Sequence, residues 1–180
     1  ILLDKDGCLS EYRVVDENAP VRGTRWYAYL EIAVNNPWYN GQSYVNTLDP
    51  SAIQKFIAIT HETYRKNFGE HFGSLIPAIF TDEPQFTHKT RLNDPKELTD
   101  IILPWTDDLP DSFYHAYGED LLTHLPQILW QLPENKISAL RYQYHDHVCQ
   151  RFTESFAKQC GTWCADHGIM LTGHMMKEPT

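Results

Sequence analysis

The sequence predicts an α/β fold with parallel strands, and two observations support this. Segments with strand propensity alternate with segments of helical 3.6-residue period, in the order hairpin, strand, helix, strand, helices, strand. Polar and aromatic residues gather after the expected strands, whereas the opposite connections are short and plain. In parallel α/β folds ligands bind at the carboxyl ends of the strands, so this asymmetry also favours a functional site.

The first elements are an expected hairpin and an expected strand. Residues 1–15 contain two apolar runs separated by the turn sequence DKDG. Residues 25–34, RWYAYLEIAV, have strand propensity throughout, and alternate side chains would share one face. These are Trp26, Ala28, Leu30, Ile32 and Val34. The sequence NNPWYNG then ends the expected strand and begins a polar, aromatic loop.

A helix with clear boundaries follows. Asp49 is a good N-cap, Pro50 suits the first helical position, and Gly69 ends the periodic pattern. The run LIPAIF after it predicts a buried strand. Pro77 lacks a backbone donor, so we expect it near the start of that strand or on a sheet edge.

The second half of the chain begins with a long loop. The segment between Pro84 and Asp111 has no regular pattern, which in compact domains usually indicates a functional or disordered loop. Residues 111–133 predict short helices with a break at Pro126. Residues 135–167 predict one long helix, and the run IMLTGH predicts a buried strand that ends at His174.

Composition restricts the class of protein. The chain is 42% hydrophobic and 22% charged, which is typical of soluble globular proteins. A net charge of -9 without a basic stripe argues against nucleic-acid and anionic-membrane partners. No apolar run approaches the ~18 residues that a spanning helix needs. The aromatic content of 13% is rich and favours a ring-shaped ligand such as a sugar.

The cysteines and histidines predict no metal site and no cofactor. The four cysteines lack zinc-site spacing, and Cys160 and Cys164 share a helical face where buried thiols are expected. Reduced thiols and the lack of a signal peptide favour a cytosolic protein. His145 and His147 are two apart on a helix and face different directions.

Two adjacent carboxylates follow the run IPAIF. Asp82 and Glu83 stand at the end of an expected strand, where like charges need a cation, a proton or a substrate to compensate them. The residues expected at the three strand ends are Asn35, Asn36, Trp38, Tyr39 and Asn40, then Asp82, Glu83, Gln85, Phe86 and His88, then His174, Lys177 and Glu178. The chain shows no glycine-rich phosphate loop and no serine nucleophile elbow. Carboxylates, amides, histidine and tryptophan instead suit carbohydrate recognition with general acid catalysis.

These residues also carry a resemblance. TDEP resembles the Asn-Glu-Pro motif of clan A glycoside hydrolases, with Asp82 where that motif has Asn. A wider pattern, from about residue 25 onward, is similar to bacterial α-L-rhamnosidase-like proteins of glycoside hydrolase family 106 and relatives. It includes NNPWYNGQSYVNTLDP, FYHAYGEDLL and WCADHGIMLTGHMMKEPT. The resemblance implies a (β/α)₈ barrel that hydrolyses a glycoside, with Glu83 as proton donor and with His174 and Glu178 lining the same pocket.

The resemblance sets the expected domain organisation. A complete barrel needs about 250 residues, so we expect residues 1–180 to form one domain that is about half of a barrel. Residues 1–22 would be a hairpin insertion and residues 23–180 three βα units. The chain lacks an initiator Met, so we expect that it begins inside a longer gene product or after processing. Open sheet edges predict self-association or pairing with the missing part of the barrel.

Alternatives stay open for the individual residues. Glu178 is a candidate second catalytic carboxylate, and Asp82 is expected to orient or bind a hydroxyl group. Trp38 and Tyr39 form a sugar platform or pack under their loop, and Asn40 is expected to bind the substrate. His174 lines the pocket or is a core histidine. The alternative function is a non-catalytic carbohydrate-binding or degenerate barrel, in which the pocket binds a sugar without turnover.

Overall fold

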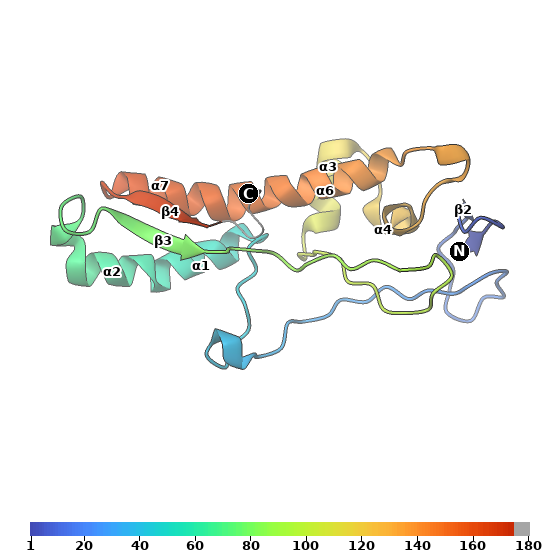
Figure 1. Ribbon diagram of the computed structural model, residues 1–180, viewed down its shortest axis with the longest axis horizontal. Helices are drawn as coiled ribbons and strands as arrows, with labels where there is room; N and C mark the ends of the chain where they lie inside the picture. The colour runs from blue at the N-terminus through green and yellow to red at the C-terminus, as the bar shows by residue number, and fades with distance from the viewer. Residues whose placement is uncertain (175–180) are drawn as a thin grey trace. The chain divides into compact units, whose positions relative to one another are not determined.

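A computed structural model describes residues 1–174 and has a broadly α/β architecture (Figure 1). The chain divides into two compact units. Unit 1 comprises Ile1–Ile32 and His88–His147, and unit 2 comprises Ala33–Thr87 and the chain from Val148 onward. No helix within residues 1–174 has the length and apolar character needed to cross a membrane.

Unit 1 combines a small hairpin with short helices. β1 (Leu2–Leu3) and β2 (Leu9–Glu11) pair antiparallel, which confirms the expected hairpin. The helices are α3 (Leu109–Tyr117), α4 (Leu121–His124), α5 (Pro126–Leu129), the 3₁₀ turn η3 (Pro133–Asn135) and the start of α6 (Ala139–Phe152). Their core contains the fully buried Leu109, Phe113, Leu121, Ile128 and Tyr144. Pro126 starts α5, as the predicted break requires.

The strand expected over residues 25–34 does not form. Ile32 and Val34 are 82% and 80% exposed, and Trp26 packs edge-on against Trp130 with ring centroids 5.1 Å apart. A strand needs a neighbour to pair its backbone groups, and no described segment supplies one here. The expectation of three βα units is therefore wrong for residues 1–174, which contain two parallel strands.

Unit 2 holds those two strands and the helices that connect and cover them. It contains the 3₁₀ turn η1 (Pro37–Tyr39), α1 (Pro50–Ile59), α2 (His61–Phe68), the 3₁₀ turn η2 (Gly69–His71), β3 (Ala78–Asp82), the π-helical turn η4 (Thr153–Ala157), α7 (Lys158–Asp166) and β4 (Met170–His174). β3 and β4 pair in parallel from Ala78 opposite Met170 to Asp82 opposite His174 (Figure 1). Parallel pairing of these two strands confirms the predicted strand–helix–strand order.

The helix boundaries follow the local signals, with two interruptions. The Asp49 carboxylate accepts a hydrogen bond from the Ser51 backbone N–H at 2.8 Å, so the predicted cap is confirmed. The single helix expected between Asp49 and Gly69 is divided at Thr60 into α1 and α2. The long helix begins at Ala139 rather than residue 135, and a π-helical turn interrupts it.

The two faces of the β3–β4 sheet have different environments. Ile79 and Leu171 pack against the cluster of Trp163, Cys164 and Ile169 beneath the helices. Because side chains alternate along a strand, Phe80, Asp82 and His174 lie on the opposite face. All three are exposed, as are Met170 and Thr172 on the same face. Within the described residues this face of the sheet is bare.

Candidate functional site

The carboxyl ends of β3 and β4 bring three of the predicted site residues together. Asp82 and His174 are register partners, and Asp82 Oδ1 lies 3.7 Å from His174 Nδ1. The Glu83 backbone N–H donates to the His174 carbonyl at 3.0 Å, which continues the ladder one residue beyond the strand. Adjacent parallel strands thus produce the cluster that the strand-end argument predicted.

Glu83 has an unusual backbone conformation. Its φ is +45°, in the left-handed region that residues other than glycine rarely adopt. It also precedes Pro84, and a residue before proline normally adopts an extended conformation. Such strain costs roughly 1–3 kcal/mol and persists only where the surroundings hold it. Asp82 and Glu83 therefore do not follow simple strand alternation, because the chain turns at Glu83 as the sheet ends.

The Asp82–His174 pair is open to solvent. Their side chains are 74% and 64% exposed, and 3.7 Å exceeds hydrogen-bond length. The contact becomes an ion pair when the imidazole is protonated, and solvent screening limits such a pair to about 1 kcal/mol or less. His174 is thus not a core histidine, which removes that alternative from the sequence analysis.

Phe80 is a site residue that the sequence analysis missed. It is 57% exposed, and its ring meets the His174 imidazole edge-on with centroids 5.2 Å apart. Phe80 precedes Asp82 by two residues, so alternation alone could have assigned both to one face. The exposed end of this face therefore presents an aromatic ring, a carboxylate and an imidazole.

The aromatic loop is a closed turn and not the end of a strand. The Asn36 side chain accepts from the Trp38 backbone N–H at 2.9 Å, and Asn40 adopts a left-handed φ of +56°. Trp38 is 85% exposed, and Tyr39 packs against Tyr44 with centroids 4.9 Å apart. The expectation that Trp38, Tyr39 and Asn40 follow a strand is wrong, because residues 25–34 have no pairing partner.

Residues 44–47 nevertheless connect this loop to the end of β3. The Gln85 backbone N–H donates to Tyr44 Oη at 3.3 Å, and Thr47 Oγ1 donates to the Gln85 carbonyl at 2.7 Å. Burial raises the pKa of Tyr44, so its hydroxyl stays protonated. The sequence analysis missed Tyr44 and Thr47, since no local pattern marks a hydrogen bond across this separation. Within residues 1–174 no ring contact or side-chain bond joins Trp38 to Asp82, Glu83 or His174.

The remaining predictions concern Glu178 and metal ligands. Glu178 lies outside the described residues. Cys160 and Cys164 are buried as expected, at 1% and 0% exposed, and burial raises the pKa of Cys160 to about 11. Thiols that stay protonated are poor metal ligands. In the described part of the chain no group of three or more His, Cys, Asp or Glu side chains is arranged to hold a metal ion.

Comparisons with known proteins add no relative to this picture. A scan against models of protein families found no match, and searches of curated proteins and of solved structures found no similar chain.

Proposed function

We propose that this chain carries the acid-bearing side of a glycoside hydrolase site, with Glu83 as the general acid. The observation that carries the proposal is the parallel pairing of β3 and β4, which puts Asp82, Glu83 and His174 at one edge of the sheet. Strand ends of this kind are the usual place for ligands in parallel α/β folds. The strained backbone of Glu83 adds support, because such strain concentrates at functional sites.

In this proposal the two parallel strands and their helices form one side of a (β/α)₈ barrel. Two adjacent parallel strands with helices on one face are what one side of a (β/α)₈ barrel contains. In that arrangement the bare face with Phe80 and Met170 would be part of the barrel interior. Asp82 and His174 would then face the substrate from inside the barrel mouth.

Each side chain has a role in this mechanism. Glu83 donates a proton to the glycosidic oxygen as the bond to the leaving group breaks. Asp82 and His174 bind sugar hydroxyls, and Phe80 offers an apolar surface to the sugar ring. Glu178 is the proposed second carboxylate, which would attack the anomeric carbon in a retaining reaction, with water later releasing the sugar, or would activate the attacking water in an inverting one. Its separation from Glu83 would set the stereochemical course, about 5–5.5 Å for retention and about 6.5–9.5 Å for inversion.

Hydrolysis of aryl glycosides tests the proposal. The panel includes aryl α-L-rhamnosides and is run on the wild type and on Glu83→Gln. The matched control is Glu70→Gln, a change of the same type at a side chain that is 81% exposed in η2. We expect Glu83→Gln to lose activity by about 10²–10⁴-fold and Glu70→Gln to keep it. Equal activity in all three proteins would exclude Glu83 as the acid.

A non-catalytic carbohydrate-binding role is the second candidate. The observation that favours it is Trp38, which is 85% exposed and available to cover a sugar ring. This role predicts sugar binding by the wild type and Glu83→Gln alike, with turnover by neither. Loss of binding in Trp38→Ala, measured by calorimetry, would support it.

A further inference from the structure

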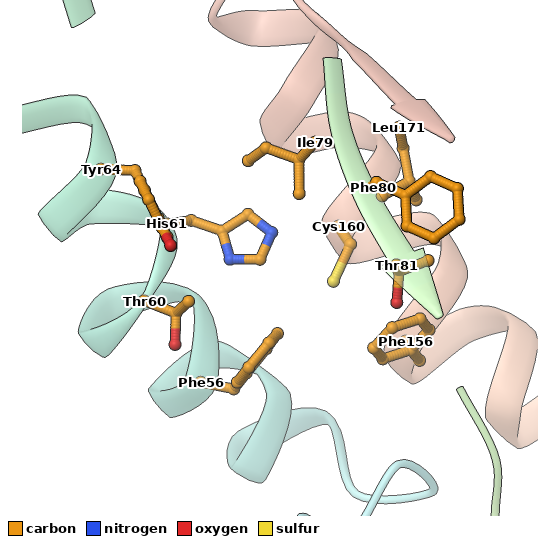
Figure 2. Close-up of a pocket in the computed structure, with 10 residues that line it drawn as sticks. All are labelled: Phe56, Thr60, His61, Tyr64, Ile79, Phe80, Thr81, Phe156, Cys160 and Leu171. Carbon is orange, nitrogen blue, oxygen red and sulfur yellow. The ribbon is translucent and has the colours of Figure 1, made fainter. Parts of the chain in front are cut away.

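A separate cavity of about 340 Å³ lies on the helix-facing side of β3 (Figure 2). Phe56 and Phe156 line it from the helical segments, and Ile79 and Leu171 line it from the sheet. Apolar cavities of about 150 Å³ hold a molecule the size of benzene. This cavity therefore has room for a ligand of two fused rings.

His61 is the unusual member of the lining. It begins α2 and is only 4% exposed, and Figure 2 shows its ring extending from the helix towards β3. Neither ring nitrogen has a hydrogen-bond partner among residues 1–174. A buried polar group without a partner costs about 1–3 kcal/mol, and such groups are rare in native proteins.

Aromatic neighbours hold the His61 ring in place. Phe56 and Trp163 both meet it edge-on, with centroids 5.3 Å and 5.0 Å away. Trp163 is fixed in turn, because its indole N–H donates to Glu62 Oε1 at 2.7 Å. The imidazole is thus positioned without a hydrogen bond to either nitrogen within residues 1–174.

The lining also restricts the charge of a ligand. None of the ten side chains labelled in Figure 2 is an acid, a lysine or an arginine. Burial lowers the pKa of His61, so its imidazole is neutral near pH 7 and offers one donor and one acceptor. A hydroxyl group, which also donates and accepts, is the complementary group. Carboxylates and ammonium groups would be buried without a counter-charge.

We propose that this cavity binds an uncharged aromatic alcohol of one or two rings, with the hydroxyl bonded to His61. Most of its lining lies on the helix-facing side of the sheet, away from Asp82 and His174, and Phe80 is common to both sites. The proposal goes beyond the proposed glycosidase activity and does not depend on it. The ring system would contact Phe56, Ile79 and Leu171, and His61 would select for the hydroxyl.

The test compares 2-naphthol with naphthalene, which lacks the hydroxyl. Binding is followed by the methyl NMR resonances of Ile79 and Leu171, for the wild type and for His61→Phe. This substitution keeps an aromatic ring and removes both nitrogens, so the variant should fold. The matched control is His71→Phe, at a half-exposed histidine in η2 outside the cavity.

The proposal predicts that 2-naphthol shifts these methyl resonances and binds the wild type and His71→Phe about threefold to tenfold more tightly than it binds His61→Phe. Naphthalene should bind all three proteins equally. Three results would overturn the proposal: no binding of 2-naphthol to the wild type, equal binding to His61→Phe, or equal binding of the two probes. Failure here leaves the Glu83 experiment unaffected, because the variants and readouts differ.

Discussion

The conformation of Glu83 shows how single residues set the direction of the candidate acid. Its φ of +45° is held by the bond from its N–H to the His174 carbonyl and by the two bonds that fix Gln85. Pro84 between them is buried. Within residues 1–174 no contact holds the Glu83 carboxylate, and the backbone sets the direction in which this exposed side chain leaves the chain.

His61 predicts a pH dependence of stability. Burial lowers its pKa below the ordinary value of about 6.5, so the unfolded chain binds the proton more readily than the folded chain. The contribution of the neutral, buried His61 to the free energy of unfolding is complete above about pH 6.5. It is lost as the pH falls below that value, because the unfolded chain then binds the proton. The titratable neighbours of His61 are Glu62, Tyr64 and Cys160; Glu62 acts in the opposite direction, and burial raises the pKa of Cys160 to about 11.

The free energy of unfolding of the wild type should therefore fall more steeply than that of His61→Phe between pH 7 and pH 5. The difference in slope is at most about 1.4 kcal/mol per pH unit for one proton. Urea unfolding at pH 7, 6 and 5 measures it, and the other histidines are common to both proteins. Parallel pH profiles would contradict a buried, neutral His61.

Among the helices and strands, the ends of helices could be predicted from the sequence, whereas the pairing of strands could not. Asp49, Pro50 and Gly69 mark helix ends because capping depends on neighbours in sequence. Residues 25–34 have the composition of a strand, yet a strand forms only where another segment pairs with it. The same reason explains the site: Asp82 and His174 were assigned from their own strand ends, whereas Phe80, Tyr44 and Thr47 depend on contacts between distant segments.

Substitution of glycines by alanine tests the pairing of β3 with β4. A Cβ added to Gly173 would lie 1.8 Å from the Thr81 carbonyl oxygen, and its φ of +150° disfavours other residues. Gly173→Ala should therefore destabilise the protein by more than about 2 kcal/mol. Gly161 in α7 has no atom within 4 Å of an added Cβ, so Gly161→Ala should stabilise it by about 0.5–1 kcal/mol. Thermal unfolding of both variants gives the comparison, and a neutral Gly173→Ala would argue against this parallel register.

Among the described residues of unit 2, one face of the two-stranded β3–β4 sheet is bare. Parallel sheets are normally covered on both faces, and Met170 is 65% exposed on the uncovered one. We therefore expect self-association through this face, whereas the sequence predicts self-association through open sheet edges or pairing with the missing part of the barrel.

Sedimentation at increasing concentration measures this association. Met170→Lys should weaken it by about tenfold or more, since burying a methionine contributes about 1.5–3 kcal/mol. Leu75→Lys is the control, because Leu75 is 78% exposed but precedes β3 in a turn. A wild type that stays monomeric at every concentration would refute this expectation.

The dependence of hydrolysis on the leaving group tests whether Glu83 is a general acid, as we propose. Rates are measured for Glu83→Gln and the wild type on phenyl and 2,4-dinitrophenyl glycosides of the same sugar. A general acid matters when the leaving group needs a proton and not when it departs as a stable anion. We expect Glu83→Gln to show a large loss of activity on the phenyl substrate and near wild-type activity on the dinitrophenyl substrate. Equal losses on both substrates would contradict it.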